Sequence, residues 1–255
     1  MHVVARGVSL HLQELGERST RPAVVMLHGL LLGSVASWYF TAAPTLAEAR
    51  RVLLYDLRGH GLSERTPRGY DVATMAGDLE ALLAARGDDA APVDLVGHSF
   101  GALVALRYAL DHPGHVRRLV LVEAPMPPSQ FHELDAFVAR PAAELLDALP
   151  VALRGLVARG GRRAARFTES MRFFVEDSSL LADLRAEPDV SNEVLATLRA
   201  STLCVYGDRS SCRAVGDRLA SVIPGAKLVV LPGGHYLHLD AAPALARAIV
   251  EHLDG

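Results

Sequence analysis

Short apolar runs alternate with longer amphipathic stretches along most of this chain, and this alternation narrows the possible folds more than any other feature. The runs lie at Ala23–Leu27, Arg51–Tyr55, Val93–Val96, Arg118–Val122, Thr202–Tyr206 and Lys227–Leu231. Nearly continuous apolar character predicts strands buried on both faces, as in a parallel sheet. Helical patterns between them span about 72–86, 101–112, 212–222 and 241–253. Strand–helix alternation predicts a mostly parallel, doubly wound α/β sheet with right-handed crossovers.

One long region interrupts the alternation. From Pro125 to Ala200 there is no strand pattern, and the segment opens with prolines before amphipathic helical patterns begin. A chain of 255 residues suits one α/β domain that carries an insertion. We therefore predict a core formed by residues 1–124 and 201–255, with a helical cap inserted at 125–200.

Composition limits the kinds of protein that the chain can be. Half of the residues are hydrophobic and the formal net charge is −3, which disfavours nucleic acid as a partner. The N-terminus lacks the pattern of a signal peptide, and no apolar run is long enough to span a membrane. The two cysteines, Cys204 and Cys212, are too few for a disulfide scaffold and need no metal to explain them. We expect a cytoplasmic protein that works without a cofactor or a metal.

A glycine-flanked serine, in Gly97-His98-Ser99-Phe100-Gly101, lies where a predicted strand ends and a predicted helix begins. A nucleophile elbow requires this strand–turn–helix context. The serine lies in a strained turn, and the flanking glycines let the backbones of the strand and the helix pass close to each other. The hydroxyl then stands at the carboxyl edge of the sheet, where open α/β sheets bind ligands. We predict that Ser99 is a nucleophile; the alternative is a serine in an ordinary glycine-flanked loop.

The order of four motifs resembles that of the α/β-hydrolase superfamily from about Val8 to the C-terminus. The motifs are His28-Gly29, the segment 56–63 (Asp-Leu-Arg-Gly-His-Gly-Leu-Ser), the serine elbow, and Gly233-Gly234-His235. The resemblance implies an α/β-hydrolase fold and an oxyanion hole formed by the backbone amides of Leu30 and Phe100.

The same resemblance places the general base at His235, in the loop before the last helix. His238 is the rival, and it is expected to cap or pack that helix instead. His98 and His60 are expected to be structural. A histidine suits the role because its ordinary pKa lies near the working pH.

The usual acid of the triad is missing from this sequence. Most of the family carries an aspartate three residues beyond the glycine that ends the preceding strand, but here Ser210 stands three residues after Gly207. Two replacements remain open, Asp208 and Glu123. We favour Glu123, which ends the strand after the nucleophile helix, because some esterases and thioesterases of the superfamily place their acid there. Ser210 then becomes an auxiliary residue that hydrogen-bonds the base or the acid.

The cap and the loop after His28 are expected to shape an apolar pocket for a lipophilic acyl group. Its predicted lining is Leu31, Trp38, Met126 and Phe131. A basic cluster in the cap comprises Arg154, Arg159, Arg162 and Arg163. It has two interpretations: a solvated helix face, or a surface that binds an anionic handle such as an acyl carrier protein.

We therefore expect a serine esterase or thioesterase that forms an acyl-enzyme with a small-molecule or carrier-bound substrate. The Ala-, Arg- and Leu-rich composition resembles that of bacteria in which polyketide thioesterases are common. The alternative keeps the fold and triad for non-hydrolytic chemistry: elimination, acyl transfer, C–C cleavage or cofactor-free peroxidation. A non-enzymatic binding module is disfavoured because the serine and histidine are intact.

Overall fold

The computed structural model describes residues 1–126, 154 and 161–255, with backbone alone at 162–164. Its central feature is an eight-stranded sheet in the order β1-β2-β4-β3-β5-β6-β7-β8. The strands are β1 (His2–Ala5), β2 (Val8–Leu15), β3 (Val24–Leu27), β4 (Val52–Tyr55), β5 (Val93–His98), β6 (Val116–Val122), β7 (Ser201–Gly207) and β8 (Lys227–Leu231). Strands β3 to β8 pair in parallel, while β2 pairs antiparallel with both β1 and β4. The predicted α/β-hydrolase fold with a mostly parallel sheet is confirmed.

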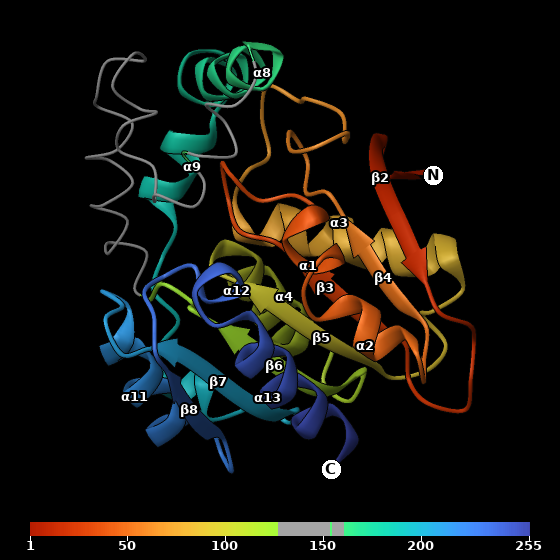
Figure 1. Ribbon diagram of the computed structural model, residues 1–255, viewed down its shortest axis with the longest axis vertical. Helices are drawn as coiled ribbons and strands as arrows, with labels where there is room; N and C mark the ends of the chain where they lie inside the picture. Colours follow the sequence, from red (N-terminus) through yellow and green to blue (C-terminus); the bar gives the residue numbers. More distant parts are fainter. Residues whose placement is uncertain (127–153, 155–160) are drawn as a thin grey trace.

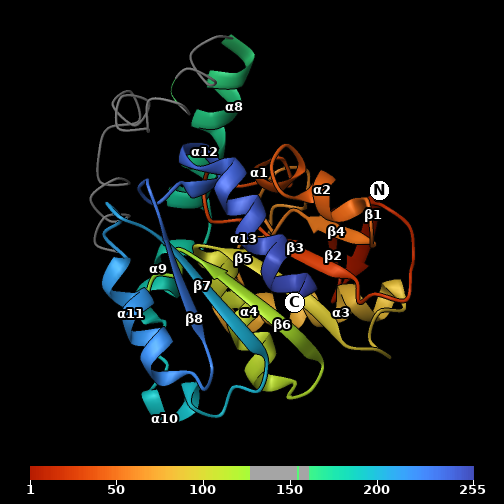
Figure 2. The ribbon, with the colours of Figure 1, turned by 60° about the horizontal axis from the view of Figure 1, so that its bottom comes forward.

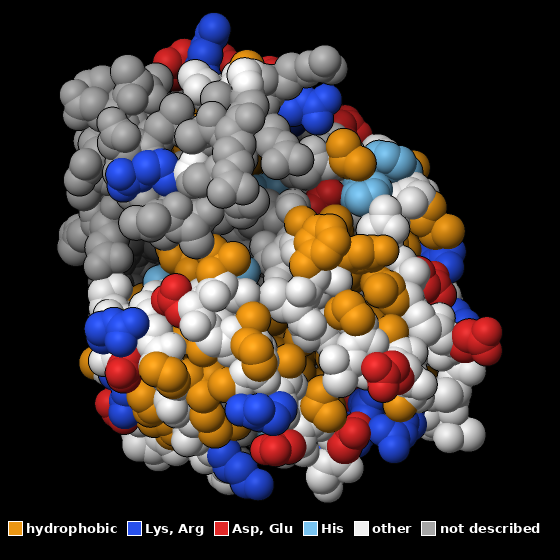
Figure 3. Space-filling view, viewed as in Figure 1, with side chains coloured by type: hydrophobic (Ala, Val, Ile, Leu, Met, Phe, Trp, Pro, Cys, Tyr) orange, Lys and Arg blue, Asp and Glu red, His pale blue; other side chains and the backbone are white. Residues whose placement is uncertain are grey.

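Helices cover both faces of the sheet, and each face has its own apolar core (Figures 1 and 2). One face is covered by α3 (Val72–Arg86), α4 (Phe100–Asp111) and α11 (Arg213–Val222). The other is covered by α1 (Ala36–Tyr39), α2 (Ala43–Ala47) and α13 (Ala242–Asp254), with α12 (Leu237–Asp240) directly before α13. On the second face, Figure 3 shows acidic and basic side chains interspersed among apolar ones.

The two N-terminal strands are absent from the sequence-based prediction. Strand β2 alternates apolar and polar residues and pairs antiparallel, so it lacks the continuous apolar run that identified the other strands. A two-residue turn joins β1 to β2, with φ 51° at Arg6 and φ 80° at Gly7. Positive φ at both turn residues matches a type I′ hairpin, but Arg-Gly is a weaker signal for that turn than Asn-Gly.

The described residues between β6 and β7 form helices, and no strand occurs among them. They are α8 (Gly161–Arg172), the π-helix η2 (Phe173–Asp177), α9 (Leu180–Ala186) and α10 (Asn192–Leu195). This segment is attached to the loop after β4: the Ser179 amide donates to the Pro67 carbonyl at 2.9 Å, and the Tyr70 amide donates to Asp183 Oδ2 at 2.9 Å. Helices α8 and α9 therefore lie at the end of the molecule that is far from the C-terminus (Figure 1). The cap boundaries at 125 and 200 stay a prediction.

Candidate active site

Ser99 occupies a sharp turn between β5 and α4. Its φ of 53° and ψ of −123° are strained for a residue with a Cβ. The turn is held by the Ser99 amide, which donates to the Val122 carbonyl at 2.8 Å, and by the Ser99 carbonyl, which accepts from the Ala102 amide at 2.9 Å. The hydroxyl is thereby presented at the carboxyl end of β5, beside the end of β6.

Two glycines make this turn sterically possible. A Cβ at Gly97 would collide with the backbone of Gly101 and Ala102, and a Cβ at Gly101 would collide with the backbone of Leu27 and His28. Helix α4 therefore crosses both β5 and the end of β3 at backbone contact distance. This crossing fixes the position of Ser99 relative to the loop after β3.

His235 lies between β8 and α12 and faces the serine. Its Nε2 is 2.9 Å from Ser99 Oγ. His98 holds the backbone of this loop, because its Nε2–H donates to the His235 carbonyl at 2.8 Å. Burial first, and then the neighbouring His238 and His235, keep the pKa of His98 well below its usual value, so His98 stays neutral. The sequence predicted a structural role for His98, and this hydrogen bond shows that His98 supports the loop that carries His235.

Glu123 lies on the opposite side of the His235 ring. It directly follows β6, is fully buried, and has a φ of 55°. The His235 Nδ1–H donates to Glu123 Oε2 at 3.3 Å, while Glu123 Oε1 accepts from the Gly207 amide at 2.5 Å. The Ser210 hydroxyl donates to Oε2 as well. The structure thus brings Ser99, His235, Glu123 and Ser210 into one hydrogen-bonded chain.

Asp208, the other acid considered, has a different position. Its Oδ1 accepts from the Gly233 amide at 2.9 Å, and its half-exposed side chain also pairs with Arg209. Within the described part of the chain, no hydrogen bond or ion pair joins Asp208 to His235. Asp208 therefore supports the loop that carries the histidine and does not orient the ring.

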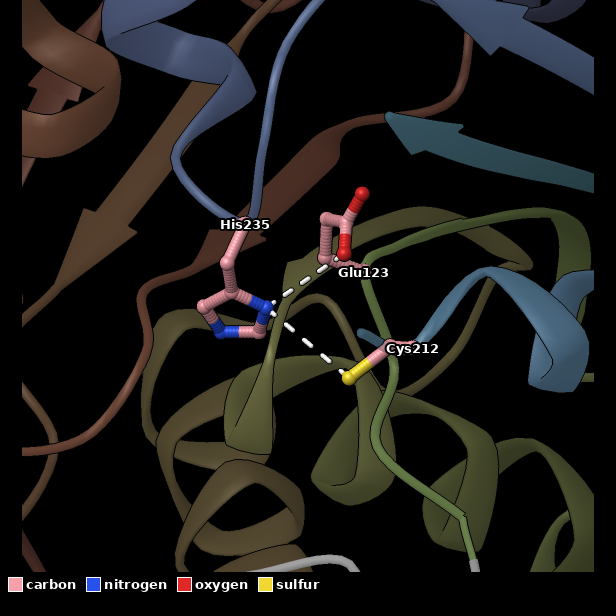
Figure 4. Close-up of side chains that lie close together, drawn as sticks. All are labelled: Glu123, Cys212 and His235. Atoms are coloured by element: carbon pink, nitrogen blue, oxygen red, sulfur yellow. Dashed lines mark hydrogen bonds and ion pairs between the residues drawn. The ribbon is translucent and has the colours of Figure 1, made fainter. Parts of the chain in front are cut away.

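Cys212 is a neighbour of the site that sequence reasoning missed. This buried free thiol, just before α11, places its Sγ 4.0 Å from His235 Nδ1 (Figure 4). Burial alone would lower the pKa of His235, but hydrogen bonds from Nδ1 to the Cys212 sulfur and the Glu123 carboxylate outweigh burial and raise it to about 9. The ring is thereby biased toward the imidazolium form.

His238 packs the core and does not reach the serine. It is buried against the rings of Trp38 and His98, and burial, assisted by His235, lowers its pKa to about 4. This placement agrees with the expected packing role of His238.

The loop after β3 lies directly against the nucleophile. A Cβ placed on Gly29 would be 3.1 Å from the Cβ of Ser99. Among the residues that the structure describes, neither the Leu30 nor the Phe100 amide donates a hydrogen bond. Both amides are therefore free to donate to another acceptor, and their role as an oxyanion hole stays a prediction.

The segment 56–63 organises this loop, a function that the motif alone did not reveal. His60 Nδ1–H donates to the Arg58 carbonyl at 2.8 Å, which leaves Nε2 to accept from the Leu31 amide at 2.9 Å. Leu31 has a positive φ of 64°, so this bond holds a strained backbone next to Leu30. Burial, with His28 as a second cause, lowers the pKa of His60 to about 3, and the ring therefore remains an acceptor at neutral pH.

The predicted pocket residues have mixed positions. Leu31 is half-buried beside the site, but Trp38, a residue of α1, is fully buried in the core, where its Nε1 donates to the Leu27 carbonyl at 2.9 Å. The Trp38 ring packs on the sheet face opposite α4, and its role in a substrate pocket stays a prediction. Met126 is almost completely buried and borders a cavity of about 280 Å³ between α4 and the segment 187–194.

Several predicted residues lie outside the described part of the chain. They are Phe131, Arg159 and the side chains of Arg162 and Arg163. Arg154 is exposed. No helix in the described ranges is both long and apolar enough to cross a membrane.

The fold and the site define a class of proteins. Residues 22–149 match the family model described as "alpha/beta hydrolase fold". The chain is also 32% identical over 239 residues to "Putative carbamate hydrolase RutD" of Klebsiella pneumoniae, an alignment that covers 87% of each protein. The chain therefore belongs to the α/β-hydrolase family, as its motifs predicted, and it is a hydrolase of that family.

Other relatives and solved structures show the range of this family. The chain is 38% identical over 130 residues to 2-hydroxy-6-oxo-2,4-heptadienoate hydrolase of Pseudomonas putida, covering 48% of this chain and 43% of the relative. A hydrolase from Pseudomonas aeruginosa superposes with a TM-score of 0.79 at 26% identity, covering 100% of this chain and 98% of that one. An enol-lactonase from Burkholderia xenovorans shares the fold, with a TM-score of 0.77 at 23% identity and complete coverage of both chains.

Proposed function

We propose that this protein is a serine hydrolase that cleaves a carboxylic ester or thioester through an acyl-enzyme on Ser99. The observation that carries the proposal is the continuous chain of hydrogen bonds from Ser99 Oγ through the two nitrogens of His235 to Glu123, with distances of 2.9 and 3.3 Å. A nucleophile, a base and a group that orients the base are the parts that acyl transfer by a serine requires.

In the first half-reaction, Ser99 Oγ attacks the substrate carbonyl while His235 Nε2 takes the hydroxyl proton. Glu123 holds the Nδ1–H tautomer, which leaves Nε2 free to accept, and stabilises the imidazolium that forms. The amides of Leu30 and Phe100 donate to the oxygen that becomes negative. His235 then returns its proton to the leaving alcohol or thiol, and the acyl group remains on Ser99.

In the second half-reaction, water replaces the leaving group. His235 Nε2 removes a proton from the water as it attacks the acyl carbonyl, and then protonates Ser99 Oγ as the bond to serine breaks. Because a neutral imidazole is needed at the start of each half, the raised pKa of His235 favours activity on the alkaline side of neutrality.

Two considerations guide the choice of substrate. The partly buried residues beside the site include the apolar Leu30 and Leu31, which supports a lipophilic acyl group. The relatives include a protein named as a carbamate hydrolase and one named as a heptadienoate hydrolase, so carbamate and C–C cleavage are the competing reactions on the same catalytic residues.

The test combines active-site labelling with a substrate panel. A fluorophosphonate probe should label Ser99 in the wild-type protein and not in Ser99→Ala. Turnover should then be compared for short and long p-nitrophenyl esters, an acyl thioester, an aryl carbamate and a vinylogous diketone. Faster turnover of the esters or the thioester supports the proposal; no labelling, or turnover of the diketone alone, overturns it.

A carrier-bound thioester is the more specific form of this proposal. Charge reversal at Arg162 and Arg163 should slow turnover of a carrier-bound acyl thioester and leave a small neutral ester unaffected. Equal effects on the two substrates would remove the carrier from the proposal.

A further inference from the structure

Three different metal-ligating side chains, one of them the candidate base His235, lie close together. Glu123 comes from the end of β6, Cys212 from the start of α11, and His235 from the loop after β8 (Figure 4). One ligand atom of each, a carboxylate oxygen, Sγ and a ring nitrogen, lies within 4.8 Å of the other two. In the proposed hydrolysis Glu123 and His235 act directly on the proton transfer, whereas the Cys212 thiol acts only through the pKa of His235.

Two of the three separations between the ligand atoms are close to those expected around one tetrahedral ion. Zinc bonds to sulfur, nitrogen and oxygen would place S and N about 3.6 Å apart, and N and O about 3.4 Å apart. In the protein, Sγ and Nδ1 are 4.0 Å apart, and Nδ1 and Oε2 are 3.3 Å apart. These two separations lie within about 0.5 Å of the tetrahedral values. The third pair, Sγ and the carboxylate oxygen, lies within 4.8 Å.

The surroundings support such a site. Ser210 donates to the Glu123 carboxylate and the Gly207 amide donates to its other oxygen, so the acidic ligand is fixed by outer hydrogen bonds. The His235 side chain is 27% exposed, whereas that of Glu123 is fully buried. Thiolate and imidazole together select a borderline-soft ion such as Zn²⁺ over Mg²⁺ or Ca²⁺.

We propose that Glu123, Cys212 and His235 form an inhibitory binding site for Zn²⁺. Binding releases the thiol proton of Cys212 and replaces the Nδ1 proton of His235 by a zinc–nitrogen bond. A neutral imidazole bound through Nδ1 carries its proton on Nε2, so it cannot accept the proton of Ser99. The ion thus occupies the orienting side of the base and stops acylation without touching the serine.

The inhibitory part of this inference rests on the proposed function, whereas the binding part does not. Zinc binding should therefore be measured directly by calorimetry on the wild type and on Ser99→Ala, which keeps all three ligands. One ion per chain should bind to both proteins. Cobalt(II) should give a thiolate-to-metal absorption band in the near ultraviolet.

The two cysteines of the chain offer a matched pair of variants. Cys212→Ala should weaken Zn²⁺ binding by more than the roughly 10–100-fold that loss of an outer-shell partner costs, and should abolish the cobalt band. Cys204→Ala, which removes the buried thiol of β7, should leave the Zn²⁺ affinity and the cobalt band unchanged. Equal zinc affinity in Cys212→Ala and wild type, or no zinc binding to the wild type, would overturn the site.

Inhibition is then read against occupancy within each variant. Zn²⁺ should slow both ester turnover and fluorophosphonate labelling of Ser99 in the wild type and in Cys204→Ala, with recovery on adding EDTA. The ratio of rates with and without Zn²⁺ should be near one in Cys212→Ala. If Zn²⁺ binds through Cys212 but turnover is unchanged, the inhibitory role is wrong. If Zn²⁺ binds but the wild type neither reacts with the fluorophosphonate nor hydrolyses any ester or thioester, the zinc site stands and the proposed function is refuted.

Discussion

Replacing Glu123 with glutamine removes one negative charge from the buried end of the Ser99–His235 chain while nearly preserving the volume of the side chain. Burial disfavours the imidazolium of His235, yet its pKa stands at about 9 instead of 6.5 because of the hydrogen bonds from Nδ1 to Cys212 and Glu123. That difference corresponds to about 3 kcal/mol in favour of the imidazolium, of which Glu123 contributes a part. This part alone can account for up to about two orders of magnitude in rate.

The glutamine amide also changes the tautomer of the base. Its oxygen can still accept from the Gly207 amide, so its NH₂ group turns toward His235 Nδ1. A ring that accepts at Nδ1 carries its proton on Nε2 and cannot deprotonate Ser99. We therefore expect Glu123→Gln to lower kcat by about 10⁴-fold, the size of effect known when an orienting carboxylate becomes an amide.

The assay is kcat and kcat/KM for a p-nitrophenyl ester across a range of pH, with thermal unfolding to show that the variant is folded. The wild-type kcat/KM should rise with pH until His235 is neutral, above about 9, and the residual activity of Glu123→Gln should rise at lower pH because the pKa of His235 falls. Asp208→Asn is the matched control, since an asparagine oxygen can still accept from the Gly233 amide, and it should stay within about tenfold of wild type. A folded Glu123→Gln that keeps more than a tenth of the wild-type kcat, or an equal loss in Asp208→Asn, would refute this reasoning.

Three further predictions follow from the strained and hydrogen-bonded residues around the serine. Ser99→Gly should be about 1 kcal/mol more stable than Ser99→Ala in urea unfolding, because glycine adopts the φ of 53° and ψ of −123° without the strain that a Cβ adds; equal stability would show that the turn is not strained. His60→Ala should lower the free energy of unfolding by about 1–3 kcal/mol and slow fluorophosphonate labelling of Ser99, because the Leu31 amide loses its acceptor. Unchanged labelling would show that His60 does not support the loop that carries the Leu30 amide. Cys212→Ala should move the acidic limb of kcat/KM to lower pH by lowering the pKa of His235, and an unmoved limb would contradict the role of that thiol.

The sequence alone was enough for the features that depend on neighbouring residues. The parallel strands were identified because burial on both faces demands continuous apolar runs, and five of the six predicted runs are fully or mostly buried. The sixth, β8, is partly exposed because it forms the edge of the sheet. The elbow was identified because the strand and the helix on either side of the strained serine cross at backbone contact distance. Such a crossing requires glycines at fixed spacing from the serine.

Only the tertiary structure decided which side chains meet around His235. Glu123 and His235 are 112 residues apart, and neither spacing nor composition states which carboxylate faces the ring. Asp208 is much nearer in sequence but turns toward Gly233, because its backbone position after Gly207 directs its side chain along the loop. Cys212 and His60 looked incidental in the sequence for the same reason: a contact between segments depends on how the strand ends align across the sheet, and a single local pattern does not encode that alignment.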